Sequence, residues 1–220
     1  MRRLAFTLAV CALSGCGLMP AKTPPKTDFD FGPESSAAAS SAAVSHAHIV
    51  VYQITAPTWM DGTAMFYRLA YQNAAVPLPY AGSDWVMPPA ELLTQRLRSN
   101  VAGGDNGETL RVSTHPAALY TLRAELLEFE QIFDAPDRSR GVLRLRATLE
   151  GEDVRAQRTF AIERAAKTPN AAGGVTALAE CSDELVRSMS DWVAANRAAT
   201  HEAAAADLGE SRSFLSAERE

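Results

Sequence analysis

Three consecutive segments of the chain, 120–126, 143–149 and 154–162, alternate apolar and polar side chains. A period of two places successive side chains on opposite faces of a strand, so each segment has one buried face and one wet face. A tight turn around Gly151 and Glu152 joins the last two segments. The pattern predicts an antiparallel meander whose apolar face must be covered by a second layer.

Two irregularities interrupt this alternation. Phe129 falls on the opposite parity from Leu122 and the other apolar residues of the first segment, which predicts a β-bulge near Leu127 or Glu128. In the third segment Arg158 is the one residue that breaks the apolar face.

Two helices are predicted to supply the cover. The first follows Ser83 and Asp84, which we interpret as caps, and Pro88 and Pro89, which suit a first turn. Its apolar residues recur every four positions: Leu93, Leu97 and Val101. The second runs from about 174 to 199 with an apolar stripe of Leu178, Leu185, Met189, Trp192 and Val193.

Upstream, the β-branched and aromatic segments 48–55 and 64–70 are predicted to be two strands joined by a turn. The fold class that follows is α+β. We expect a two-layer sandwich in which a mostly antiparallel sheet carries both helices on one face.

The chain begins with the pattern of a secretory signal. Two arginines precede an apolar run from Leu4 to Leu13, which is about half of the ~20 residues that a membrane-spanning helix needs. Leu-Ser-Gly-Cys at 13–16 then resembles the bacterial lipobox, in which the chain is cut before an acylated cysteine. We therefore expect a lipid anchor on Cys16. A plain signal peptide with an incidental cysteine is the alternative.

Charge and cysteine content restrict the function. Loss of residues 1–15 removes two of the 21 basic residues and leaves 26 acidic ones, a net charge of −7, which argues against nucleic acid or anionic headgroups as partners. Cys11 leaves with the signal and Cys16 carries lipid, so only Cys181 remains in the folded part. No internal disulfide is then possible.

Composition divides the chain into four parts. Residues 1–15 are the expected signal peptide, and 16–47, with proline and a Ser/Ala run, are expected to be a flexible tether. One domain is expected over 48–199. Residues 200–220 are expected to be a frayed helix extension or a disordered tail.

The order of elements resembles the ABC-type transport auxiliary lipoprotein family, which includes the lipoprotein of the paraquat-inducible operon and other partners of MCE-type lipid-transport systems. The resemblance covers nearly all of the expected domain. It lies in the lipobox, Val-Tyr-Gln-Ile at 51–54, Met-Phe-Tyr-Arg at 65–68, YAGSDWVMPPAELLTQRL at 80–97, YTLRAELLEFEQ at 120–131, GVLRLRATL at 141–149 and DELVRSMSDWV at 183–193.

The resemblance implies a non-enzymatic periplasmic subunit that assembles with an MCE-domain protein and ABC-type inner-membrane components. Family behaviour makes a homo-oligomer plausible. Gly17 stands where an Asp would retain an enteric lipoprotein in the inner membrane, so we expect the periplasmic leaflet of the outer membrane. The chain departs from the family in the 31 residues between Cys16 and the first expected strand, and in the tail from 201 to 220.

The family's signature concentrates at Tyr67, Arg68, Tyr80 and Trp85, and Tyr, Trp and Arg are typical of binding hot spots. We interpret these four residues as a candidate partner-binding surface. The alternative is structural: Trp85 packs at the helix start and Tyr80 caps the sheet edge.

The other reactive residues indicate no catalytic, metal or cofactor site. His46 and His48 lack a nearby carboxylate or thiolate, and we expect solvated linker histidines. Cys181 is expected to be a small buried hydrophobe. A nucleophile elbow is missing around the serine, threonine and histidine at 113–115, and the glutamates of the first meander segment (Glu125, Glu128 and Glu130) are expected on its wet face or bulge.

Two other functions remain open. The chain can be an assembly factor or plug for an outer-membrane channel. It can also be a carrier that holds an acyl chain, although the meander offers only one apolar face, already needed by two helices.

Overall fold

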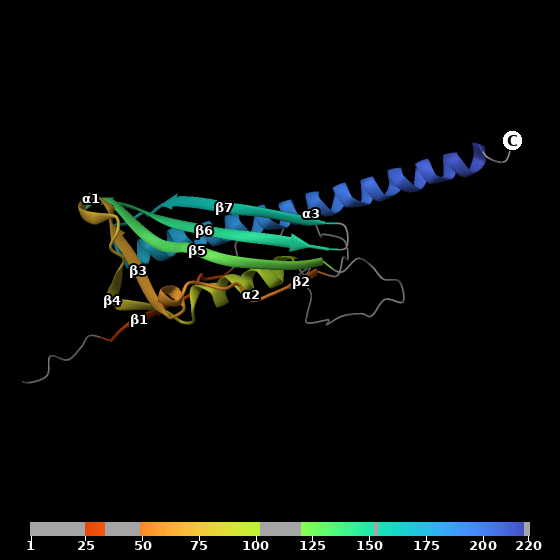
Figure 1. Ribbon diagram of the computed structural model, residues 1–220. Helices are drawn as coiled ribbons and strands as arrows, with labels where there is room; N and C mark the ends of the chain where they lie inside the picture. Colours follow the sequence, from red (N-terminus) through yellow and green to blue (C-terminus); the bar gives the residue numbers. More distant parts are fainter. Residues whose placement is uncertain (1–24, 34–48, 102–119, 152–153, 218–220) are drawn as a thin grey trace, which may run out of the picture.

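The structure, a computed structural model, describes residues 25–33, 49–101, 120–151 and 154–217 (Figure 1). In chain order the elements are β1 (Thr27–Phe29), β2 (Ile49–Val51), the 3-10 turn η1 (Thr58–Met60), β3 (Ala64–Leu69), α1 (Ala70–Asn73), β4 (Leu78–Trp85), α2 (Pro89–Val101), β5 (Tyr120–Ala135), β6 (Arg138–Glu150), β7 (Arg155–Ala165) and α3 (Ala171–Ala217).

The strands form one sheet in the order β1-β4-β3-β5-β6-β7, and β2 also pairs with β5. The long β5–β6 and β6–β7 ladders are antiparallel, as the alternation predicts, and so is β3–β4. The short pairs β1–β4, β2–β5 and β3–β5 are parallel, so the sheet is mixed. The two upstream strands, β2 and β3, each pair with β5 rather than with each other, and the α+β class is confirmed.

The predicted bulge is present in β5, where the register with β6 shifts between Leu126 and Glu128. The extra residue returns Phe129 to the side of Leu122 and Leu126, and all three are buried in the core.

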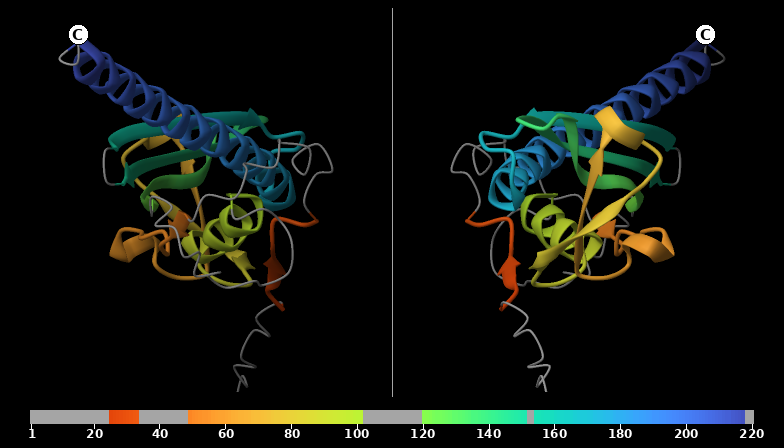
Figure 2. Two further views of the ribbon diagram at one scale, coloured as in Figure 1. Left: turned by 90° about the vertical axis from the view of Figure 1, so that its right-hand side faces the viewer. Right: turned by 90° about the vertical axis from the view of Figure 1, so that its left-hand side faces the viewer.

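Helices α2 and α3 cover this apolar face together (Figure 2). Leu93 and Leu97 of α2 and the α3 residues Leu178, Leu185, Met189 and Val193 join one core with the meander. Helix α2 begins at Pro89, so Ser83 and Asp84 are not its caps. Both lie in β4, where they pair with β1, because their extended backbone serves the sheet.

Glycines allow α3 to approach the sheet closely. A Cβ on Gly141 of β6 would lie 3.0 Å from the Cβ of Ala177, and one on Gly174 of α3 would lie 2.1 Å from Oε1 of Gln131. A larger residue at Gly141 has to push the helix away from the strands, and one at Gly174 has to displace the Gln131 side chain.

The N-terminal end of the domain differs from the sequence expectation. Residues 27–32 lie inside the expected tether, yet β1 joins the sheet edge and Phe31 is buried. We call residues 27–32 the strap. At the other end α3 continues as one helix to Ala217 and projects beyond the sheet (Figure 1). Within the described residues, no helix combines the length and the apolar character needed to cross a bilayer.

Candidate functional site

The strap is fixed to the domain by an aromatic cluster. The Phe31 ring lies 5.6 Å from that of Trp85 on β4 and 5.7 Å from that of Phe129 on β5, measured between centroids. Trp85 and Phe129 are themselves 5.5 Å apart. Three segments distant in sequence therefore meet at the end of the strap.

Arg96 of α2 contacts the same segment through polar interactions. Its side chain is only 7% exposed. One guanidinium nitrogen donates to the Gly32 carbonyl at 2.7 Å, and another forms an ion pair with Asp183 of α3 at 2.9 Å. The guanidinium carbon also lies 5.4 Å from the Phe31 ring centroid. Arg96 thus joins the strap, α2 and α3.

The chain turns sharply where Arg96 holds it. Gly32 has a φ of +66°, a conformation that glycine adopts without strain, and its N–H donates to Asp30 Oδ1 at 2.7 Å. This turn forms the C-terminal end of the strap.

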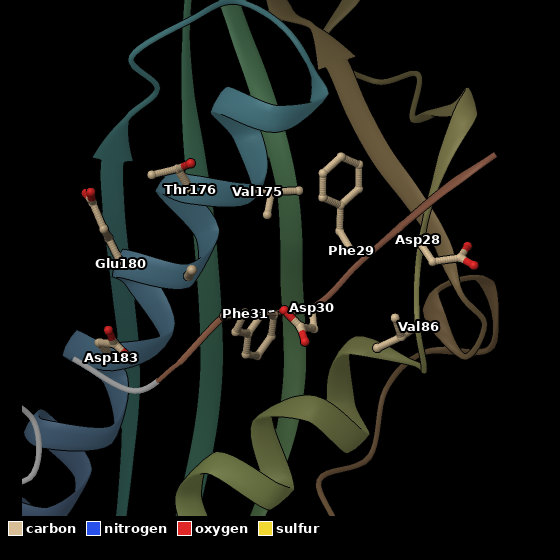
Figure 3. Close-up of a pocket in the computed structure, with 11 residues that line it drawn as sticks. Asp28, Phe29, Asp30, Phe31, Val86, Val175, Thr176, Glu180 and Asp183 are labelled. Carbon is tan, nitrogen blue, oxygen red and sulfur yellow. Dashed lines mark hydrogen bonds between the residues drawn. The ribbon is translucent and has the colours of Figure 1, made fainter. Parts of the chain in front are cut away.

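A groove of about 440 Å³ lies between the strap and α3 (Figure 3). Its apolar lining includes Phe29 of the strap and Val175 of α3 (Figure 3). Carboxylates stand on both walls: Asp28 and Asp30 on the strap, Glu180 and Asp183 on α3. The groove therefore combines apolar lining with an acidic rim.

Two of the predicted site residues, Tyr67 of β3 and Tyr80 of β4, do meet. Their ring centroids are 4.5 Å apart. The Tyr80 hydroxyl donates to Gln131 Oε1 at 2.8 Å, and the Gln131 amide donates to Ser139 Oγ at 2.7 Å. Burial raises the pKa of Tyr80 to about 12, and Tyr67 adds to the shift. This cluster holds β4 to the central strands through a polar chain that includes the fully buried Gln131.

Arg68 follows Tyr67 on β3 and therefore points to the other face of the sheet. Its Nε forms an ion pair with Glu130 at 2.6 Å, and it donates to the Ala74 carbonyl at 3.0 Å. Glu130 is 2% exposed, so its side chain is buried rather than solvent-exposed as expected for the open face of the sheet. Burial raises its pKa and outweighs the opposing effect of Arg68.

Trp85 lies in the core at the end of β4, 2% exposed, so it offers no surface to a partner. The four predicted residues thus do not form one binding surface: Tyr67 and Tyr80 share a cluster, Arg68 lies on the opposite face, and Trp85 packs against the strap. The structural alternative fits Trp85 better, although it packs against Phe31 and Phe129 rather than at a helix start. Sequence reasoning missed the strap and Arg96, because the alternation in Asp-Phe-Asp-Phe-Gly at 28–32 is too short to stand out.

Cys181 is buried as predicted. Its Sγ lies 3.6 Å from the Gly141 carbonyl oxygen and 3.8 Å from that of Ile162. Burial raises the pKa of the thiol to about 12. Within residues 25–33, 49–101, 120–151 and 154–217, no cluster of three or more acidic, histidine or cysteine side chains could hold a metal.

Four sequence predictions lie outside the described residues: the signal peptide over 1–15, lipidation of Cys16, the pair His46 and His48, and the segment 113–115. The glutamates of β5 are described. Glu125 pairs with Arg146, and Glu128 pairs with Arg144 at 2.9 Å, both on the open face of the sheet.

A family model described as the ABC-type transport auxiliary lipoprotein component matches residues 29–190. The chain belongs to this family. The match begins inside the strap and ends within α3, so the family's domain includes the segment that sequence composition assigned to a tether.

Solved structures show the same fold. A protein from Xanthomonas campestris is 17% identical over 70% of this chain and 88% of its own, with a TM-score of 0.58. A second, uncharacterized protein is 14% identical over 77% of this chain and 99% of its own, with a TM-score of 0.59. A search of curated proteins found no match.

Proposed function

We propose that this protein is a lipid-anchored auxiliary subunit of an ABC/MCE-type system that moves lipids or other hydrophobic molecules between membranes. The observation that carries the proposal is the family match, which spans the domain from the strap into α3. The lipobox that ends at Cys16 supports the anchor, and Gly17 supports the periplasmic leaflet of the outer membrane.

The strap changes the expected reach of this anchor. Only ten residues, 17–26, separate Cys16 from β1, instead of the 31 that composition suggested. Such a segment spans at most ~36 Å, and its typical end-to-end distance is ~18 Å if it behaves as a flexible coil. The domain is therefore held close to the bilayer, with the strap side nearest the lipid.

The role within the system is that of a non-catalytic binding subunit. Its buried thiol is protonated at neutral pH because the pKa is raised to about 12. An MCE-domain periplasmic protein and ABC-type inner-membrane components are the expected partners, and a homo-oligomer is compatible with this role.

The experiment compares the full-length chain with Cys16→Ser in the native host. We expect mass spectrometry to find acylation of the wild type on Cys16, and membrane sedimentation and co-purification of MCE-domain and ABC components to be lost in the variant. Cys11→Ser is the matched control, because it changes a cysteine of the expected signal without touching the acylation site.

Three results would contradict the proposal. They are an unmodified Cys16, a Cys16→Ser protein that still sediments and supports transport, and co-purification with an outer-membrane β-barrel in place of the transporter. The last result would support an assembly factor or plug.

A further inference from the structure

The strap presents an open strand edge to the groove. In the parallel pair β1–β4, Phe29 is opposite Trp85, and the Val86 N–H donates to the Phe29 carbonyl at 2.9 Å. Successive residues of a strand direct their main-chain groups to opposite sides. Because Phe29 bonds to β4, the N–H and C=O groups of Asp28 and Asp30 point away from the sheet.

Helix α3 stands across the groove from this edge, with Val175 and the small side chain of Ala179 in the lining. A groove between an edge strand and a helix is the geometry in which an extended peptide adds a strand to a sheet. Gly32 lies in the turn and its carbonyl accepts from Arg96, so the open edge runs over Asp28 to Asp30 and would pair with about three residues of such a peptide, roughly 10 Å of strand.

The lining indicates which peptide would fit. Its apolar part suits alternate apolar side chains, and its rim is acidic. Asp28, Asp30 and Glu180 are exposed, and no basic side chain in the described part of the chain forms an ion pair with them. Asp183, by contrast, is neutralised by Arg96. Charge complementarity therefore favours a cationic segment.

We propose that this groove binds an extended segment of a partner protein, with alternating basic and apolar residues, which adds to the edge of β1 as a further strand. The inference rests on the proposed function only in assigning that segment to a subunit of the transport system.

The test uses the full-length lipoprotein in detergent and a labelled seven-residue peptide of alternating lysine and valine with blocked ends. Fluorescence anisotropy measures its binding. We expect saturable binding that falls about tenfold or more when the rim charge is reversed in Asp28→Lys/Glu180→Lys. Asp61→Lys/Asp191→Lys makes the same charge change at two exposed positions outside the groove, and we expect it to stay within about twofold of the wild type.

A second peptide separates strand addition from simple charge attraction. It has the same sequence, but N-methyl groups on alternate residues prevent one edge of the peptide from donating main-chain hydrogen bonds. When the methylated edge is the one that faces β1, binding should be abolished. Spermidine, added at the same concentration of positive charge as the peptide, should displace little of the labelled peptide. Circular dichroism should be the same for all variants, because both rim residues are exposed.

Several outcomes would overturn the inference: no saturable binding, equal binding to the rim variant, equal binding of the methylated and unmethylated peptides, or full competition by spermidine. Self-association of the chain that depends on the same rim residues would show that a second copy occupies the groove instead. If peptide binding fails while Cys16-dependent co-purification of the transporter persists, the groove assignment is wrong and the proposed function stands.

Discussion

The strap and the meander belong to one sheet but are held in different ways. In β6 the inward residues Leu143, Leu145 and Leu149 are fully buried under the helices. The strap pairs only three residues with β4 and depends on Phe31 and on the polar contacts of Arg96. The meander is therefore stabilised by continuous apolar burial, whereas the strap is attached at a few points.

This difference implies two modes of failure. Loss of a meander contact should lower the stability of the whole domain, because the core is contiguous from α2 to α3. Loss of a strap contact should first release the border segment, since a short edge element opens at lower free energy than the core.

The largest expected effect is that of Leu145→Ala, which creates a cavity under α3. We expect a loss of about 2–5 kcal/mol in the free energy of unfolding, measured by urea denaturation. Arg146→Ala is the matched control, because the next residue faces the open side and its ion pair with Glu125 is exposed; it should cost less than about 1 kcal/mol. Equal losses would mean that the two faces are not distinct.

Arg96→Met should cost less, about 2 kcal/mol, because it removes the hydrogen bond to the Gly32 carbonyl and the ion pair with Asp183, whose carboxylate is partly exposed to water. The distinguishing measurement is hydrogen exchange. Amides of residues 27–32 should lose protection while those of β5 and β6 keep theirs. Uniform loss across the sheet would show that the strap and meander unfold together.

Tyr80→Phe removes the hydrogen bond to Gln131 and should cost about 1 kcal/mol at neutral pH. Its pH dependence follows from the raised pKa. Above pH 10 the unfolded chain loses the phenol proton more readily than the folded chain, so wild-type stability should decrease between pH 10 and 12. The variant lacks this contribution. Its stability deficit should therefore shrink over that range in urea denaturation, and a constant deficit would contradict the assigned shift.

Lys26→Ala should have the smallest effect, at most about 0.5 kcal/mol. Its ion pair with Asp84, at 2.6 Å, also ties the start of the strap to β4, but Lys26 is half exposed and solvent screens the pair. Exchange at residues 27–29 should change far less than in Arg96→Met. A comparable change would mean that surface charge, rather than the buried contacts of Arg96, holds the strap.

The same contrast explains what the sequence could predict. Alternation in the meander is a local pattern, and it was sufficient to predict β5 to β7, the bulge before Phe129 and the covered face. In the strap the alternation is too short to recognise. Phe31 becomes a core residue only through contacts with Trp85, Arg96 and Phe129, 54 to 98 positions away. Ser83 and Asp84 were misassigned as helix caps for the same reason, because their partner strand β1 could not be recognised in the sequence.

The candidate site was less predictable than the fold. Tyr67 and Tyr80 meet because antiparallel pairing brings β3 beside β4. Only two upstream strands are expected from the sequence, and β4 is not among them. The groove could not be predicted from the sequence. Its two walls come from residues 28–32 and 175–183, and neither segment alone carries a recognisable motif.

The 47-residue length of α3 has a consequence for how the molecule moves. A helix of this length measures ~70 Å, of which the last 18 residues, ~27 Å, extend past residue 199. Such a rod makes rotational diffusion anisotropic and increases the hydrodynamic radius above that of a sphere of equal mass. For the lipid-anchored chain proposed above, this helix would let the protein contact partners well beyond the surface of its folded domain.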